Sequence, residues 1–184
     1  MTDRRYLIYG VTGSGKTTLA QHLAARCGLP FHPVDDLTWL PDWQAVPDDA
    51  QRQIITELCS RDSWVIDSAY AAWLDVPLAR ADVVVGLDYP RWLSLWRVAR
   101  RSVARAIDKN PICGGNVESW RRVLSAESMV VWHFKSFRRK RDRIRAWSRS
   151  SPGPRIVRLR SPRATARWLD SLEAPAREVW RSAP

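Results

Sequence analysis

One stretch near the start of the chain constrains the fold more than any other. Residues 10–17, GVTGSGKT, match the pattern G-x-x-x-x-G-K-[S/T] at every fixed position. A short apolar run at 6–9 precedes them, and apolar residues at helical spacing follow from 16 to 27. A strand, a glycine-rich turn and a helix in this order form a loop whose backbone N–H groups can surround phosphate oxygens. The stretch therefore predicts a phosphate-binding loop within an α/β fold.

The residue types of this loop suit a nucleoside triphosphate. Lys16 supplies a positive charge for the β- and γ-phosphates, and Thr17 supplies a hydroxyl for a Mg²⁺ ion that bridges them. Glycines let the loop curl without steric clashes, so its N–H groups can point inward. The predicted nucleotide-binding residues are Gly13, Ser14, Gly15, Lys16, Thr17 and Thr18.

Further apolar runs predict the rest of the fold. Strands are expected at residues 31–34, 64–66, 83–87 and 155–159, with helices between them. The runs at 64–66 and 83–87 are uninterrupted, as in strands that helices cover on both faces. Strands that alternate with helices predict a parallel sheet in a three-layer α/β fold, with ligands at the carboxyl ends of the strands. We expect residues 1–184 to form a single domain of this kind.

Two aspartates at the ends of predicted strands are candidates for the metal site. Asp67 is the favoured partner of Thr17 in binding Mg²⁺, and a plain turn residue is the alternative interpretation. Asp88 either provides such a ligand or caps the helix that follows Pro90. The metal site is therefore assigned to Thr17 and Asp67.

A third aspartate points to a phosphate acceptor. Asp35 follows the second predicted strand and suits the orientation or deprotonation of an acceptor hydroxyl, and an Asx turn before a helix is the alternative. Trp39 and Trp43, a few residues later, either stack on a planar or sugar-like substrate or pack in the interior. Asp35 is thus a candidate catalytic residue beside Lys16.

A basic helix is predicted after Pro90. The apolar positions that predict its buried face are Trp92, Trp96, Ala99, Val103 and Ala106. Arg97 and Arg101 are four residues apart and share a neighbouring face of the helix. Phosphoryl transfer needs positive charge around the transferring group, so both arginines are predicted catalytic residues, with a solvated surface stripe as the alternative.

Residues 105–140 are the predicted lid. The Pro, Gly and Asn residues within 108–120 predict a mobile loop that could bring Arg97 and Arg101 over the nucleotide. A long helix follows, and the residues that mark its inner side are Val130, Phe134, Phe137, Arg141 and Ile144. The dense charges of this helix, at Arg138, Arg139 and Arg141, are expected to form a solvated face.

Charge is unevenly distributed along the chain. The net charge is +11. Residues 1–90 carry 7 basic and 12 acidic side chains (−5), whereas 91–184 carry 23 and 7 (+16). A nucleic-acid-associated P-loop ATPase, or a kinase of polynucleotide ends, is therefore an alternative to a kinase of small molecules, and an ATPase switch without an acceptor is a third hypothesis.

Cysteine spacing and hydropathy predict a cytoplasmic protein. Cys27, Cys59 and Cys113 are far apart and favour neither a zinc site nor a disulfide framework. No apolar run is long enough to cross a bilayer. We therefore expect reduced thiols and no membrane partner.

The chain resembles the DNA topology modulation protein-like group of P-loop kinases, which are relatives of adenylate kinase. The resemblance extends in order from about Tyr6 to Leu172 and is most specific in its aspartate-tryptophan stretch and in LDYPRW. The stretches that carry it are GVTGSGKTTLA, HPVDDLTW followed by PDW, WVIDSAY, LDYPRWLSLWRVARR and RIVRLRSP. Ser68-Ala69 departs from the Gly-Asn of the family, beside the expected acceptor pocket.

The resemblance implies an adenylate-kinase-like fold with a helical lid and a parallel sheet in the order 2-3-1-4-5. It implies ATP with Mg²⁺, and it assigns nucleotide phosphates to Arg97 and Arg101. Asp67 corresponds to the carboxylate that ends the third strand, and Asp35 to the aspartate of the second-strand motif. The sequence therefore predicts an ATP-dependent kinase of a nucleotide or another small molecule, with the acceptor unidentified.

Overall fold

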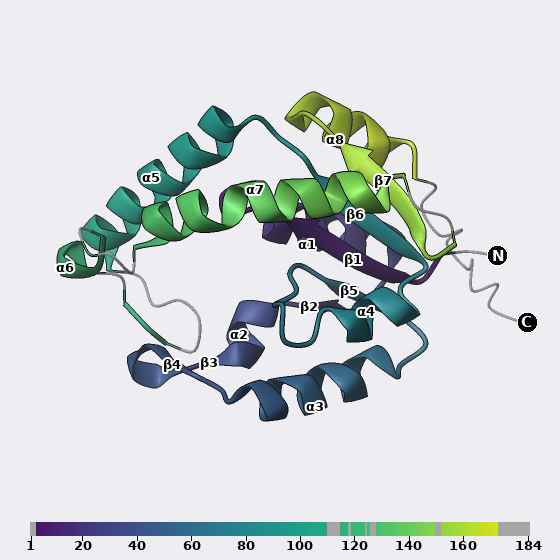
Figure 1. Ribbon diagram of the computed structural model, residues 1–184, viewed down its shortest axis with the longest axis horizontal. Helices are drawn as coiled ribbons and strands as arrows, with labels where there is room; N and C mark the ends of the chain where they lie inside the picture. The colour runs from purple at the N-terminus through teal and green to yellow at the C-terminus, as the bar shows by residue number, and fades with distance from the viewer. Residues whose placement is uncertain are drawn as a thin grey trace, which may run out of the picture.

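Five parallel strands form the central sheet of the computed structural model, which describes residues 3–109, 115–117, 119–123, 125, 128–149 and 152–172. Their order across the sheet is β2-β5-β1-β6-β7 (Figure 1). Their bounds are β1 Arg5–Gly10, β2 Phe31–His32, β5 Trp64–Ile66, β6 Val83–Leu87 and β7 Arg155–Leu159. Counted along the chain, these five strands have the predicted order 2-3-1-4-5. The numbering differs because an unpredicted antiparallel hairpin, β3 (Trp39–Leu40) and β4 (Gln44–Ala45), intervenes.

The strand register brings the carboxyl ends together at one edge. Leu7 of β1 is paired with Ile66 of β5 on one side and with Val84 of β6 on the other. Gly10, the last residue of β1, is paired with Leu87, the last residue of β6. The segments that follow β1, β5 and β6 therefore begin beside one another, and these segments contain the residues that the sequence predicts for the site.

Helices cover both faces of the sheet, as Figure 1 shows, with α1 behind the strands and α7 in front. Adjacent residues of β1 enter different cores: Ile8 packs with α1, whereas Leu7 packs with α3, α4 and α7. Both side chains are fully buried. The three-layer α/β fold is thus confirmed. The helix bounds are α1 Lys16–Cys27, α2 Val34–Thr38, α3 Asp48–Cys59, α4 Asp75–Arg80, α5 Arg91–Asp108, α6 Trp120–Val123, α7 Met129–Trp147 and α8 Pro162–Asp170, with a 3₁₀ turn at Pro41–Trp43.

The predicted buried face of α5 is wrong. Trp92 and Trp96 are 70% and 55% exposed, and Val103 is also exposed. The buried residues are instead Ser94, Val98, Ser102 and Ala106, of which only Ala106 belongs to the predicted set. The reason is that α5 packs directly on the phosphate-binding loop. A Cβ atom on Gly13 would lie 2.4 Å from the Ser94 carbonyl oxygen, so only small side chains fit on this side of the helix.

The inner side of α7 differs from the prediction by part of a turn. Phe137 and Ile144 are buried as predicted, whereas Phe134 is exposed. The other buried residues of the helix are His133, Ser136 and Lys140. A hydrogen bond of 2.8 Å joins the Ser94 hydroxyl of α5 to the His133 ring, and it fixes how α7 faces α5.

Two predictions fall partly on residues outside the described ranges. The loop at 108–120 and the lid at 105–140 include 110–114, 118, 124 and 126–127, which the structure does not describe. Cys113 is among them, whereas Cys27 and Cys59 are free thiols. No helix in the described part of the chain combines the length and the apolar character needed to span a membrane.

Candidate active site at the carboxyl ends of the strands

The phosphate-binding loop connects β1 to α1 at the carboxyl edge of the sheet. Gly13 and Gly15 have φ angles of 77° and 90°, in the left-handed region that disfavours side chains. The Ser14 hydroxyl donates to the Val11 carbonyl oxygen at 2.7 Å and holds the curl in place. Within the described residues, α1 has no side-chain cap and no acid in its first turn. Its positive end is therefore directed at the loop, where phosphate would bind.

Lys16 lies where the predicted catalytic groups converge. Its ammonium donates to the Val11 carbonyl oxygen at 3.0 Å, across the loop. Burial lowers the pKa of Lys16, while the carboxylates of Asp35 and Asp67 act in the opposite direction. The positive charge of Arg101 lowers this pKa further. Groups from α2, the end of β5 and α5 thus all act on one ammonium.

Thr17 and Asp67 meet directly. The Thr17 hydroxyl donates to one carboxylate oxygen of Asp67 at 2.5 Å, and the Val34 amide donates to the other at 3.0 Å. Burial raises the pKa of Asp67, and these two hydrogen bonds partly oppose the rise. No cluster of three His, Cys, Asp or Glu side chains occurs among the described residues. A hydroxyl and a carboxylate fit Mg²⁺, which commonly takes one or two protein oxygens and completes its shell with phosphates and water.

Arg97 and Arg101 both face the phosphate-binding loop from α5. Arg97 donates to the Ser14 carbonyl oxygen at 3.4 Å and lies 5.9 Å from the centre of the Tyr89 ring. Arg101 is close enough to Lys16 to affect its pKa. Neither arginine therefore belongs to a stripe directed only at solvent.

A cleft of about 790 Å³ lies between the loop, α5 and α8. Gly13, Gly15 and Thr18 form its floor, and Arg97, Arg100 and Arg101 line one wall. The opposite wall comes from Thr165, Leu169 and neighbouring residues of α8. This volume is in the range of small-molecule sites, and the cleft combines a basic wall with an apolar one. It suits a nucleotide with its phosphates on the loop and its base against α8.

Asp35 lies on the other side of Lys16, in the first turn of α2. The predicted strand 31–34 is shorter than expected, because β2 ends at His32 and α2 already begins at Val34. The Asp35 carboxylate is exposed and accepts a hydrogen bond of 2.8 Å from the Tyr70 hydroxyl. Tyr70 belongs to the segment after β5, so two strand ends jointly position this carboxylate.

Trp39 and Trp43 flank Asp35 on the hairpin side. Their rings meet edge to face with centroids 6.1 Å apart, and both side chains are half-buried. The backbone N–H of Trp43 donates to the side-chain oxygen of Asn116 at 2.7 Å. The side-chain amide nitrogen of Asn116 donates to the Leu40 carbonyl oxygen at 2.8 Å. The described part of the predicted lid therefore contacts the hairpin beside Asp35.

Asp88 is neither a helix cap nor a metal ligand beside the loop. The cap position of α5 belongs to Pro90, and the Asp88 side chain is 1% exposed. Its carboxylate pairs with Arg141 of α7 at 2.7 Å and with Arg158 of β7 at 2.5 Å, and Arg145 lies 3.3 Å away. The sequence places Arg141 both on the inner side of the helix and on its solvated face; the ion pair with Asp88 agrees with the inner side and corrects the solvated one.

Sequence reasoning missed two side chains next to the candidate site. Tyr70 was not distinguished from its neighbours, because nothing in the pattern links it to Asp35. Lys140 was not distinguished from the dense charges around it, yet the structure buries it on α7, within electrostatic range of Lys16 and Asp35. Its position three residues after Phe137 and four before Ile144 is the signal that could have identified it.

Comparison with known proteins supports the fold. Residues 6–70 match the family model "ATPase family associated with various cellular activities (AAA)", which is well under half of the chain. No curated protein sequence matches the chain. The structure is similar to shikimate kinase from Acinetobacter baumannii in complex with shikimate, at 18% identity and a TM-score of 0.58, covering 92% of this chain and 90% of that one.

Two further solved structures have similar statistics. An unliganded sugar kinase from Janibacter sp. has 19% identity and a TM-score of 0.51, with 92% of this chain and 94% of that chain covered. A gluconokinase from Sinorhizobium meliloti has 16% identity and a TM-score of 0.50, with 91% and 94% covered. At these identities the similarity establishes the fold, which is that of P-loop kinases.

Proposed function

We propose that this chain is an ATP-dependent kinase that transfers the γ-phosphoryl group to a hydroxyl of a nucleotide or another small molecule. One arrangement carries the proposal: Asp67 accepts a hydrogen bond from Thr17 of the loop, while a second carboxylate, Asp35 of α2, is held by Tyr70 within electrostatic range of Lys16. An ATPase needs a carboxylate for the metal, whereas a kinase also needs a group for the acceptor. The P-loop kinase fold and the resemblance to the DNA topology modulation protein-like group support the same reaction.

The donor half of the site uses the loop and α5. Lys16 and the N–H groups from Gly13 to Thr18 would hold the β- and γ-phosphates. Thr17 and Asp67 would bind Mg²⁺, which neutralises phosphate charge during transfer. Arg97 and Arg101 would face the transferring group from the opposite wall, where positive charge stabilises its equatorial oxygens. Residues 105–140 would act as the lid that excludes water.

The acceptor half uses Asp35. Its carboxylate would accept the proton of the acceptor hydroxyl as the oxygen attacks phosphorus. Tyr70 would restrain Asp35 by donating to one oxygen, which leaves the other oxygen available to the acceptor. Trp39 would cover the acceptor from the hairpin. We also propose that the protein acts in the cytoplasm, in keeping with the free thiols of Cys27 and Cys59.

The decisive test compares Lys16→Ala with the unchanged protein in an assay of ADP release with ATP and Mg²⁺. The acceptors are shikimate, gluconate, sugars, nucleosides, nucleotides and an oligonucleotide with a 5′-hydroxyl. We expect one acceptor class to stimulate ADP release, and Lys16→Ala to reduce that rate by about a hundredfold or more. Lys135→Ala, on the exposed side of α7, is the control and should have no effect. Equal rates of ADP release for Lys16→Ala and the unchanged protein, or no stimulation by any acceptor, would contradict the proposal.

A polynucleotide acceptor is the second candidate, and the outer face of α5 favours it. Trp92 and Trp96 are exposed, and the Arg100 guanidinium lies 5.0 Å from the centre of the Trp96 ring. Exposed aromatic rings beside arginines can stack on bases while binding phosphates. Binding of a single-stranded oligonucleotide should then weaken at least tenfold between 50 and 200 mM salt. Trp96→Ala should bind the oligonucleotide more weakly than the unchanged protein at the same salt concentration. An affinity that does not change with salt concentration would exclude this candidate.

A further inference from the structure

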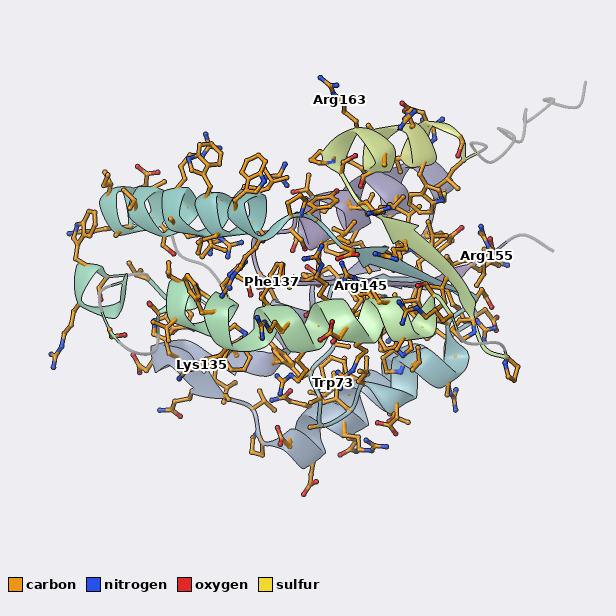
Figure 2. The ribbon with its side chains drawn as sticks, turned by 45° about the horizontal axis from the view of Figure 1, so that its top comes forward. Trp73, Lys135, Phe137, Arg145, Arg155 and Arg163 are labelled. Carbon is orange, nitrogen blue, oxygen red and sulfur yellow. The ribbon has the colours of Figure 1, made fainter. Side chains whose placement is uncertain are left out.

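The inner side of α7 contains a lysine that the reaction outlined above does not use. Lys140 is only 9% exposed, although it stands within the most highly charged part of the chain. Figure 2 shows α7 in front of the sheet, with Phe137 and Arg145 before and after this position. The Lys140 ammonium lies 5.7 Å from the centre of the Tyr9 ring, and Tyr9 is the last residue but one of β1. The side chain therefore extends toward the start of the phosphate-binding loop.

Within the described residues, this ammonium has neither a hydrogen bond nor a carboxylate at ion-pair distance. Its neighbours on α7 differ in this respect, because Arg141 and Arg145 both contact Asp88. A largely buried ammonium without an anion is costly, since it has lost most of its contact with water and gained only the face of one aromatic ring. Such a group is the expected counterpart of an anionic ligand.

The electrostatic neighbours of Lys140 come from both the donor and the acceptor parts of the site. Burial lowers its pKa to about 7, and Lys16 on the loop lowers it as well. Asp35 on α2 acts in the opposite direction, and Arg139 and Arg143 of its own helix add to the lowering. Lys140 thus lies beside Tyr9 at the end of β1, within electrostatic range of both the donor lysine and the acceptor carboxylate.

We propose that Lys140 is a catalytic residue whose ammonium donates hydrogen bonds to the equatorial oxygens of the transferring phosphoryl group. This inference rests on the proposed kinase function. In the transfer, the acceptor oxygen forms a bond to the γ-phosphorus, and the bond from that phosphorus to the bridging oxygen of ADP breaks. The bonding electrons remain on ADP, and the hydroxyl proton passes to Asp35. Lys140 keeps its protons throughout and stabilises the negative charge between donor and acceptor.

The first experiment needs no acceptor. Binding of ADP with Mg²⁺, with and without aluminium fluoride as a mimic of the transferring group, is measured by calorimetry. Lys140→Met should bind ADP as the unchanged protein does but should lose about a hundredfold in affinity for the fluoride complex. Equal affinity of both proteins for the complex would overturn the inference and leave the kinase proposal intact. Failure of the unchanged protein to bind ADP would contradict the proposed function, and the inference would fall with it.

The second experiment uses the pH profile of kcat/KM with the acceptor found in the screen. Transfer requires charged Lys140, so the rate should fall as the pH rises above about 7. Lys140→Arg should remove this decline, because a guanidinium stays charged. Lys16 remains in this variant, so its own titration cannot account for the change. Persistence of the decline at the same pH in Lys140→Arg would contradict the assignment.

The melting temperature distinguishes a catalytic role of Lys140 from a role in packing. Removal of an unpartnered buried charge should leave the melting temperature of Lys140→Met unchanged or raise it. Arg149→Met, exposed just beyond the end of α7 and outside the proposed lid, is the matched control for both rate and stability. Should Lys140→Met raise only the KM of the acceptor and keep kcat, the ammonium would bind the acceptor, and the proposed contact with the phosphoryl group would be wrong.

Discussion

Two aspartates at the ends of strands, Asp67 and Asp88, have different partners and different roles. Asp67 and Asp88 both follow an apolar strand, both are buried, and the sequence offers both as metal ligands. Asp67 contacts a loop hydroxyl, whereas Asp88 lies among the guanidinium groups of Arg141 and Arg158. Burial alone would favour the neutral acid, but the hydrogen bonds and charges of these arginines hold the pKa of Asp88 below its ordinary value. Asp88 thus joins β6 to α7 and β7.

Replacement of Asp88 should therefore destabilise the fold. Asp88→Asn leaves half-buried arginines without their anion, so we expect a loss of about 2–3 kcal/mol in the free energy of unfolding, measured by denaturant titration. The control, Asp75→Asn, breaks an exposed pair with Arg52 and should leave the midpoint nearly unchanged.

The same residue should contribute to acid unfolding. A carboxylate with a lowered pKa in the folded state stabilises the protein fully above the ordinary pKa of about 4, and the stabilisation is lost as the pH falls below that value. The unchanged protein should therefore lose stability below about pH 4 more steeply than Asp88→Asn. Equal stability of the two proteins at neutral pH, or equal slopes in acid, would show that these ion pairs contribute nothing.

The parts of the site that a local motif encodes were predictable, and the parts that tertiary packing creates were not. Lys16 and Thr17 follow from their places in the loop, and Asp67 follows from the end of a strand. Their assignment to ATP and magnesium stays a prediction that the experiments above address. Lys140 and Tyr70 could not be predicted, because each gains its neighbours from segments far away in the chain.

At the level of elements, α5 shows how an amphipathic pattern can mislead. Periodicity indicates that one face of a helix is apolar, but it does not say what packs on which face. Here the glycine-rich loop approaches α5 so closely that tryptophan cannot fit between them, and the apolar stripe faces outward. The helix itself, from Arg91 to Asp108, was predicted correctly because Pro90 marks its start.

Gly13→Ala should separate α5 from the loop. The new Cβ would lie 2.4 Å from the Ser94 carbonyl oxygen and 2.5 Å from Val98, and the φ angle of 77° is unfavourable for alanine. We expect a loss of more than about 2 kcal/mol in the free energy of unfolding, and a weaker affinity for ATP by about tenfold or more. The matched control is Gly115→Ala, because Gly115 has a φ of 89° with nothing within 4 Å. Equal losses for the two variants would show that the close approach is unimportant.

At the level of the whole molecule, topology was the most predictable property. Buried strands without interruption and alternating helices suffice for a parallel sheet with both faces covered. The family resemblance implies the strand order 2-3-1-4-5. The structure has this order when the hairpin at residues 39–45 is not counted. That hairpin was not predicted because its strands contain only two residues each, too few for a periodic signal.

The positive charge of the second half is only partly available to an external partner. Arg141, Arg145 and Arg158 surround Asp88, while Arg97 and Arg101 face the nucleotide cleft. The net charge of residues 91–184 therefore exceeds the charge that a nucleic acid would meet. This weakens the argument from net charge for a nucleic-acid partner, because these five of the 23 basic side chains are directed at Asp88 or the cleft.

The buried side of α5 consists of Ser94, Val98, Ser102 and Ala106, one short side chain per turn, and the first two lie against Gly13 of the loop. Bulky side chains interdigitate and resist a shift of the helix along its axis, whereas a row of short side chains resists such a shift much less. A helix packed through such a row can shift along its axis with little repacking, in the manner of shear between packed elements, once the hydrogen bond between Ser94 and His133 breaks. Closure of the site would then occur by translation of α5 along the loop. Arg97 and Arg101 would reach the phosphates by this translation rather than by rotation about a hinge.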